Sequence, residues 1–211
     1  MIPRKKLVPP TTHVRDARLY IIVVEGERTE HGYFMALESS KFIQTDRIQP
    51  YIVPSRDGKS APQHLVNNAE RAIAEYGPLM PQDELWLVFD VDKHSGSNRI
   101  EQIHSALHIA ESQGWIVALS NPCFEVWLLL HLADDLLGID DYGETAENKL
   151  RDLLSGYSKS TVPKPCLDRQ AIQLAITRAK ARDTDPNSPI PELPGTRVYR
   201  LVERLVGTRV V

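Results

Sequence analysis

The chain has 211 residues, of which 42% are hydrophobic and 25% charged, and its formal net charge is −3. This balance is ordinary for a globular protein and excludes a uniformly basic chain, so nucleic acid would need a local basic patch or a metal ion. No window is long and apolar enough to cross a bilayer, and the start, MIPRKKLVPP, lacks the apolar core of a signal peptide. We therefore expect a cytoplasmic protein with no membrane contact.

The chain begins with a segment in which apolar residues show no periodic pattern. Predicted strands and helices then alternate. Residues 1–16 are rich in Pro, Lys and Arg and are predicted to be a flexible lead-in. Short β-rich apolar runs then alternate with stretches whose apolar residues recur at helical spacing. The predicted strands cover 19–24, 48–53, 84–89 and 115–119, and the predicted helices cover 30–42, 61–76, 98–113 and 123–137.

Strand–helix units in succession predict an α/β fold with a mostly parallel sheet and helices on both faces. After residue 137 the pattern changes to an acidic loop and Pro-rich linkers. A short helix is predicted to end near residue 154, and further helices are predicted over 169–182 and 196–206. We interpret residues 17–137 as the α/β core. Residues 138–211 are predicted to form a helical appendage that packs on this core.

Polar residues follow three of the predicted strands at the points where these strands end. Glu25 follows the first strand, Asp90 and Asp92 follow the third, and Asn121 and Glu125 follow the fourth. Because parallel strands bring their carboxyl ends to one edge of a sheet, these side chains are expected to share the ligand crevice there.

Several carboxylates at one edge of a sheet repel one another unless a cation lies between them. All the candidate ligands are oxygens, which favours Mg²⁺, with Mn²⁺ as a substitute. In an extended segment residues i and i+2 point to the same side, so Asp90 and Asp92 could share one ion.

The remaining acids have simpler interpretations. Glu27 and Glu30 are interpreted as first-turn acids that complement the positive end of the next helix. Glu125 fits this interpretation as well as it fits a metal ligand, and both stay open. Gly26 has no Cβ, so the backbone could turn tightly there beside an ion or a phosphate.

The motifs VVEGERTE and FDVDKH resemble the Toprim signature, a Glu after the first strand and a D-x-D after the third. Toprim domains belong to topoisomerases, primases and OLD-type nucleases, which are metal-dependent enzymes acting on phosphodiester bonds. The chain more closely resembles the RloB-like family, which is associated with restriction loci and phage defence. That resemblance rests on VEGERTEHGYF, FDVDKH, SNPCFEVWLLLH and TRVYRLVERL, and LPGT departs from an expected NPST.

The resemblance implies a Rossmann-like Toprim core and assigns roles to its acids. Glu25 matches the Toprim glutamate, a general acid/base or metal ligand, and Asp90 and Asp92 match the metal-binding aspartates. Asn121 and Glu125 belong to the family's own motif, with roles left open. Lys159 matches a lysine that stabilises the transition state in OLD-type nucleases, and an ordinary linker lysine is the alternative.

We therefore expect a Mg²⁺-dependent nuclease of bacterial antiviral defence, active in abortive infection. Nucleic acid, DNA or RNA, is the expected partner, and a defence protein such as an ATPase could be another. Positive charge for the phosphate backbone would come from Arg28, Lys93, His94 and Arg99, and Asn121 would orient a water or phosphate oxygen. The alternatives are a subunit that senses nucleotide or nucleic acid without chemistry, and a structural subunit.

Overall fold

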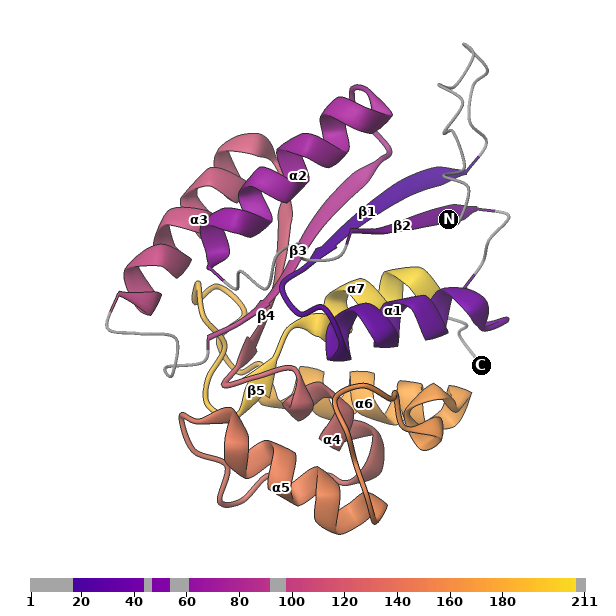
Figure 1. Ribbon diagram of the computed structural model, residues 1–211, viewed down its shortest axis with the longest axis vertical. Coiled ribbons are helices and arrows are strands. Elements are labelled where there is room, and N and C mark those ends of the chain that lie inside the picture. Colours follow the sequence, from indigo (N-terminus) through magenta and orange to yellow (C-terminus); the bar gives the residue numbers. More distant parts are fainter. Residues whose placement is uncertain (1–16, 44–46, 54–60, 92–97, 208–211) are drawn as a thin grey trace, which may run out of the picture.

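The protein is described by a computed structural model over residues 17–43, 47–53, 61–91 and 98–207. The predicted lead-in over residues 1–16 lies outside the described residues. The centre of the fold is a five-stranded sheet with the strand order β2-β1-β3-β4-β5 (Figure 1). Its strands are β1 (Arg18–Val24), β2 (Ile48–Val53), β3 (Glu84–Asp90), β4 (Ile116–Asn121) and β5 (Gly195–Thr196).

The sheet is mostly parallel, as the alternating pattern predicted. Strands β1 to β4 pair in parallel, and only β5 runs antiparallel, alongside β4. The apolar run of β1 is buried on both faces, because alternate side chains enter two separate cores. Tyr20, Ile22 and Val24 enter one core, whereas Leu19, Ile21 and Val23 enter the other.

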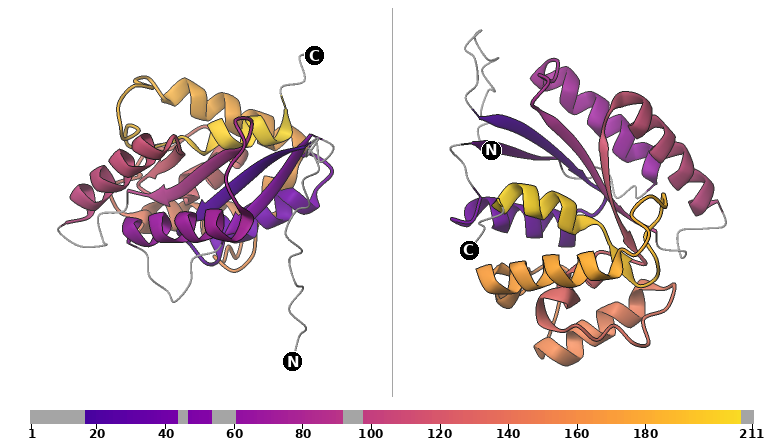
Figure 2. Two further views of the ribbon diagram at one scale, coloured as in Figure 1. Left: turned by 90° about the horizontal axis from the view of Figure 1, so that it is seen from above. Right: turned by 180° about the vertical axis from the view of Figure 1, so that it is seen from behind.

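Helices cover both faces of the sheet and form three layers with it. Helices α2 (Pro62–Tyr76) and α3 (Arg99–Gln113) pack on one face. Helices α1 (Thr29–Ser39) and α7 (Val198–Val206) pack on the other, and the view from behind shows α6 (Arg169–Arg182) beside α7 (Figure 2). Within the described part of the chain, no helix is long and apolar enough to cross a membrane.

Helix α4 (Glu125–Leu132) is enclosed by α6 and by α5 (Gly143–Leu154). Its residues from Glu125 to His131 are all buried, as expected of a helix that is apolar on every side. The helices after residue 138 share one core with α1 and α4, so this core continues from the sheet into the C-terminal part. A short 3₁₀ helix, η2 (Lys164–Leu167), connects α5 to α6.

Three predicted helices had boundaries that were wrong by two residues or more. The helix predicted over 30–42 ends at Ser39, because the backbone is extended at Ser40. The helix predicted over 123–137 is shorter, because the backbone is extended at Ala133 and Asp135 accepts a hydrogen bond from the Leu137 amide in a turn. The last helix was predicted from residue 196, but Gly195 and Thr196 pair with β4 as β5 and the helix begins at Val198. A strand of two residues carries no periodic pattern that a sequence could reveal.

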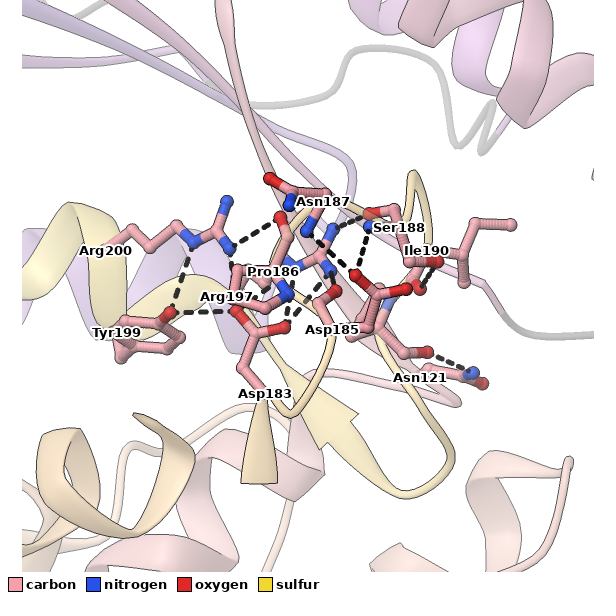
Figure 3. Close-up of polar contacts among 11 residues, drawn as sticks. Asn121, Asp183, Asp185, Pro186, Asn187, Ser188, Ile190, Arg197, Tyr199 and Arg200 are labelled. Atoms are coloured by element: carbon pink, nitrogen blue, oxygen red, sulfur yellow. Dashed lines mark hydrogen bonds and ion pairs between the residues drawn. The ribbon is translucent and has the colours of Figure 1, made fainter. Parts of the chain in front are cut away.

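The C-terminal part is tied together by a buried carboxylate (Figure 3). Asp183 accepts hydrogen bonds from Arg197 Nε at 3.1 Å, Tyr199 Oη at 2.8 Å and Arg200 Nη2 at 2.7 Å. Arg197 also donates to the Asp185 carbonyl, which joins the loop after α6 to the start of α7. Burial alone would raise the pKa of Asp183, but these hydrogen bonds and the Arg197 charge outweigh it and hold the pKa below its usual value.

We expect Asp183→Asn to lower the free energy of unfolding at pH 7 by about 3 kcal/mol, because Arg197 would stay buried without its counter-charge. Urea unfolding measures this change. Because the folded pKa is lowered, the contribution of Asp183 is present above an unfolded pKa of about 3.9 and is lost as the pH falls below it. The exposed ion pair of Lys180 with Glu203 is the control, and Glu203→Gln should cost less than about 1 kcal/mol. Equal stability of Asp183→Asn and the wild type at pH 7 would contradict this role.

Candidate functional site

The predicted acidic residues meet at the switch point of the sheet. The chain passes from β1 to β2 on one side and then crosses to β3 on the other, so β1 and β3 are neighbours. In an open α/β sheet, the crevice for a ligand lies beyond the carboxyl ends of two such strands. Glu25 directly follows β1, and Asp90 is the last residue of β3.

Glu25 is buried and held by two donors. Its Oε2 accepts a hydrogen bond from the Asp90 backbone amide at 3.1 Å and from Arg99 Nη2 at 2.8 Å. Arg99 is only 2% exposed and also donates to the Asp90 carbonyl at 2.6 Å. We expected Arg99 to contact phosphate, but the structure buries its guanidinium in an ion pair that fixes Glu25 against the end of β3.

Glu30 belongs to the same site, which the sequence did not reveal. It lies in the first turn of α1 as predicted, but its carboxylate is buried and lies over Gly26. A Cβ atom at position 26 would stand 2.0 Å from Glu30 Oε2, so any other residue there would displace this carboxylate from its position. The missing Cβ of Gly26 therefore accommodates Glu30, and our interpretation of Glu30 as a helix-end acid alone was wrong.

Glu125 reaches the site from the first turn of α4 and is contacted by the segment after α5. The Tyr157 hydroxyl donates to Glu125 Oε1 at 3.1 Å, and both side chains are buried. Lys159 Nζ lies 3.9 Å from the same oxygen and 3.2 Å from Glu147 Oε2. The structure thus brings Lys159, which is distant in sequence, to the edge of the acids.

The carboxylates of Glu25, Glu30, Asp90 and Glu125, here called the acidic cluster, are close enough for their charges to raise the pKa of Asp90 and of Glu30. Burial raises the pKa of Asp90 well above its usual value, and the charges of Glu30, Glu25 and Glu125 raise it further. Burial, followed by the charges of Glu125 and Glu25, raises the pKa of Glu30 to about 7, although its own backbone amide and Lys159 oppose the shift. Four carboxylates therefore face two neighbouring cations, Arg99 and Lys159, and ionisation of Asp90 and Glu30 is unfavourable without a further positive charge.

The donor atoms of the acidic cluster suit a hard cation. All of them are carboxylate oxygens, the type of ligand that Mg²⁺ and Mn²⁺ take in proteins. One oxygen, Asp90 Oδ1, is buried and has no hydrogen-bond partner among the described residues. Over those same residues, no three His, Cys, Asp or Glu side chains are already arranged around a common ion position. The donor atoms fit the chemistry of the ion, and its binding would require the carboxylates to rearrange around it.

The other predicted site residues make different contacts, are exposed, or lie outside the described residues. Asn121 Nδ2 donates to the Pro191 carbonyl at 2.9 Å and so holds the loop between α6 and β5 (Figure 3). Arg28 is exposed on the turn between β1 and α1. Asp92, Lys93 and His94 lie outside the described residues, so their predicted roles as metal ligand and phosphate contacts stay predictions.

Comparison with protein families agrees with the motifs at this site. The model of a family described as RloB-like protein matches residues 20–205, which is most of the chain. The chain belongs to the RloB-like family. No curated protein and no solved structure matches this RloB-like chain significantly.

Two members of the site in this RloB-like chain were missed for different reasons. Glu30 had a usable signal, because a helix that begins directly after a strand end points its first turn back over that edge of the sheet. Tyr157 had none, since a tyrosine in a linker between helices carries no pattern and its partner, Glu125, is 32 residues away.

We predict that Glu30→Gln stabilises the protein at alkaline pH. The pKa of Glu30 is about 7 in the folded state and 4.5 as its usual value. The free energy of unfolding therefore falls as the pH rises through this interval, because Glu30 must ionise in a buried position. In urea unfolding with EDTA, the variant should gain about 3 kcal/mol over the wild type at pH 8 and almost nothing at pH 4. The exposed acid Glu111 on α3 is the control, since Glu111→Gln should show no such pH dependence. Parallel pH profiles of Glu30→Gln and the wild type would contradict the burial of this carboxylate in the cluster.

Proposed function

We propose that this RloB-like protein is a divalent-metal-dependent phosphodiesterase that hydrolyses nucleic acid. The observation that carries this proposal is the convergence of four carboxylates at the switch point of the sheet, with a lysine at their edge. Carboxylates in such number lower each other's ability to ionise, and a bound cation removes that cost. A metal ion held by these carboxylates would face the crevice in which an α/β sheet binds its ligand.

The ligands would be the acidic cluster together with Asp92, which lies outside the described residues. A bound Mg²⁺ or Mn²⁺ would supply charge for the scissile phosphate and lower the pKa of a bound water. The chain's own residues position this chemistry. Arg99 holds Glu25 beside β3 through an ion pair, and Tyr157 fixes the orientation of Glu125.

Lys159 would contact the phosphate of the substrate directly. Its side chain is half exposed at the edge of the acidic cluster, where a phosphate oxygen could reach the ammonium, and a positive charge there would stabilise the negative charge of the transition state. Arg28 is exposed on the turn that follows β1, four residues after the end of that strand. It could contact the backbone of the nucleic acid. The chain has a net charge of −3 and as a whole would repel nucleic acid. Such local cations and the metal would have to overcome this repulsion.

The resemblance to restriction-associated families supports a role in antiviral defence, with abortive infection as its outcome. A partner such as an ATPase would then control when the nuclease acts. A metal-dependent nuclease would threaten its own cell, and this is the physical reason to expect such a control.

The proposal predicts metal-dependent cleavage of nucleic acid. Purified protein is incubated with labelled single- and double-stranded DNA and RNA in Mg²⁺, Mn²⁺ or EDTA. We expect products with either metal and none in EDTA, and a loss of about 100-fold or more in rate for Asp90→Ala. Glu111→Gln, on the exposed side of α3, should cleave like the wild type.

Two other outcomes would contradict the proposal. Tight binding of nucleic acid without products would instead favour a sensing subunit, whose acidic cluster holds a ligand without chemistry. Cleavage that persists in EDTA, or in Asp90→Ala, would place the activity outside the acidic cluster.

A further inference from the structure

Lys159 lies between two carboxylates that differ in depth. The inner one, Glu125, is 4% exposed and belongs to the acidic cluster. The outer one, Glu147 on α5, stands 3.2 Å from Lys159 Nζ, which is closer than the 3.9 Å to Glu125. The ammonium is therefore held at the rim of the cluster rather than inside it.

The surroundings of this lysine are fixed, and its own side chain is the part that can move. Tyr157, two residues before it, is buried and bonded to Glu125, so the backbone of the segment is anchored. Glu147 is held by an ion pair with Arg151 one turn further along α5. The side chain of Lys159 is 51% exposed, and its four-carbon stem can carry the ammonium from one carboxylate to the other.

A lysine this close to the acidic cluster competes with a metal ion. An ammonium against Glu125 offsets part of the negative charge, and it would repel a divalent cation bound to the same carboxylate. Entry of the cation is easier if the ammonium has another carboxylate to move to. Glu147 is the carboxylate within its reach on the outer side.

We propose that Glu147 is a positioning residue that receives Lys159 at the rim and so allows the lysine to leave Glu125 when a divalent cation enters the acidic cluster. The inference rests on the proposed function, because it assumes that the cluster binds a cation. It adds that residues other than the metal ligands influence the affinity for this cation, through the ion pair of Lys159 with Glu147. Glu147 would also keep Lys159 where it can meet a phosphate.

The test is a double-mutant cycle on Mn²⁺ affinity, read from the electron paramagnetic resonance signal of free Mn²⁺ and requiring no substrate. The wild type is compared with Glu147→Gln, Lys159→Met and the double variant. We expect Glu147→Gln to weaken Mn²⁺ binding about three- to tenfold while Lys159 is present, and less than about twofold in Lys159→Met. Lys159→Met alone should bind Mn²⁺ more tightly than the wild type.

A second ion pair between a residue of α5 and a residue outside this helix provides the control. Lys149 Nζ lies 3.2 Å from Asp135 Oδ2 and also donates to the Leu137 carbonyl, so Asp135→Asn likewise removes one carboxylate beside a lysine of α5. This variant should bind Mn²⁺ like the wild type. Circular dichroism spectra of all variants establish that each is folded.

Each other outcome overturns one proposal or both. If Glu147→Gln weakens Mn²⁺ binding equally with and without Lys159, Glu147 acts only through its own charge, and the inference alone is wrong. The same holds if Glu147→Gln has no effect while the wild type binds Mn²⁺. If neither the wild type nor Lys159→Met binds Mn²⁺, the metal dependence of the proposed function is wrong, and the inference fails with it.

Discussion

The repulsion among four carboxylates at one edge of the sheet is the constraint on which the rest of this site depends. Burial removes the water that would screen these charges, and the pKa of Asp90 and of Glu30 rises in consequence. The fold holds the charges together nonetheless, because Glu25 and Asp90 lie at the ends of adjacent strands and Glu125 begins a helix that is buried up to His131. The buried Arg99 offsets part of this charge beside Glu25, and the half-exposed Lys159 offsets part of it near Glu125.

This arrangement separates two kinds of contact. Glu25 and Glu125 each have a partner that fixes their orientation, Arg99 for the first and Tyr157 for the second. Asp90 instead keeps one buried oxygen without a partner among the described residues. A site built only for stability would satisfy that oxygen, since an unsatisfied buried acceptor costs free energy. The difference between these acids is consistent with a site that binds a charged ligand.

The sequence predicted the sheet and the edge of the site because both depend on regular patterns. An apolar run such as Leu19–Val24 reveals a doubly buried strand, and acids directly after such runs must lie at the carboxyl edge. The orientation of individual side chains depends on tertiary contacts that no pattern encodes. Thus Arg99 looked like a surface cation and is a buried ion-pair partner, while Asn121 holds a distant loop.

The contacts of Tyr157 and Lys159 with Glu125 bear on how this protein could be dissected. All four acids of the cluster lie in the first 125 residues, whereas the hydroxyl and the ammonium that steady Glu125 come from the segment that follows α5. A fragment ending near residue 137 would keep every acid of the cluster and lose both stabilising groups. It would also expose α4 on the sides that α5 and α6 cover. A fragment with all the acids of the cluster is therefore unsuited to expression by itself, and attempts to isolate a minimal domain should retain α6.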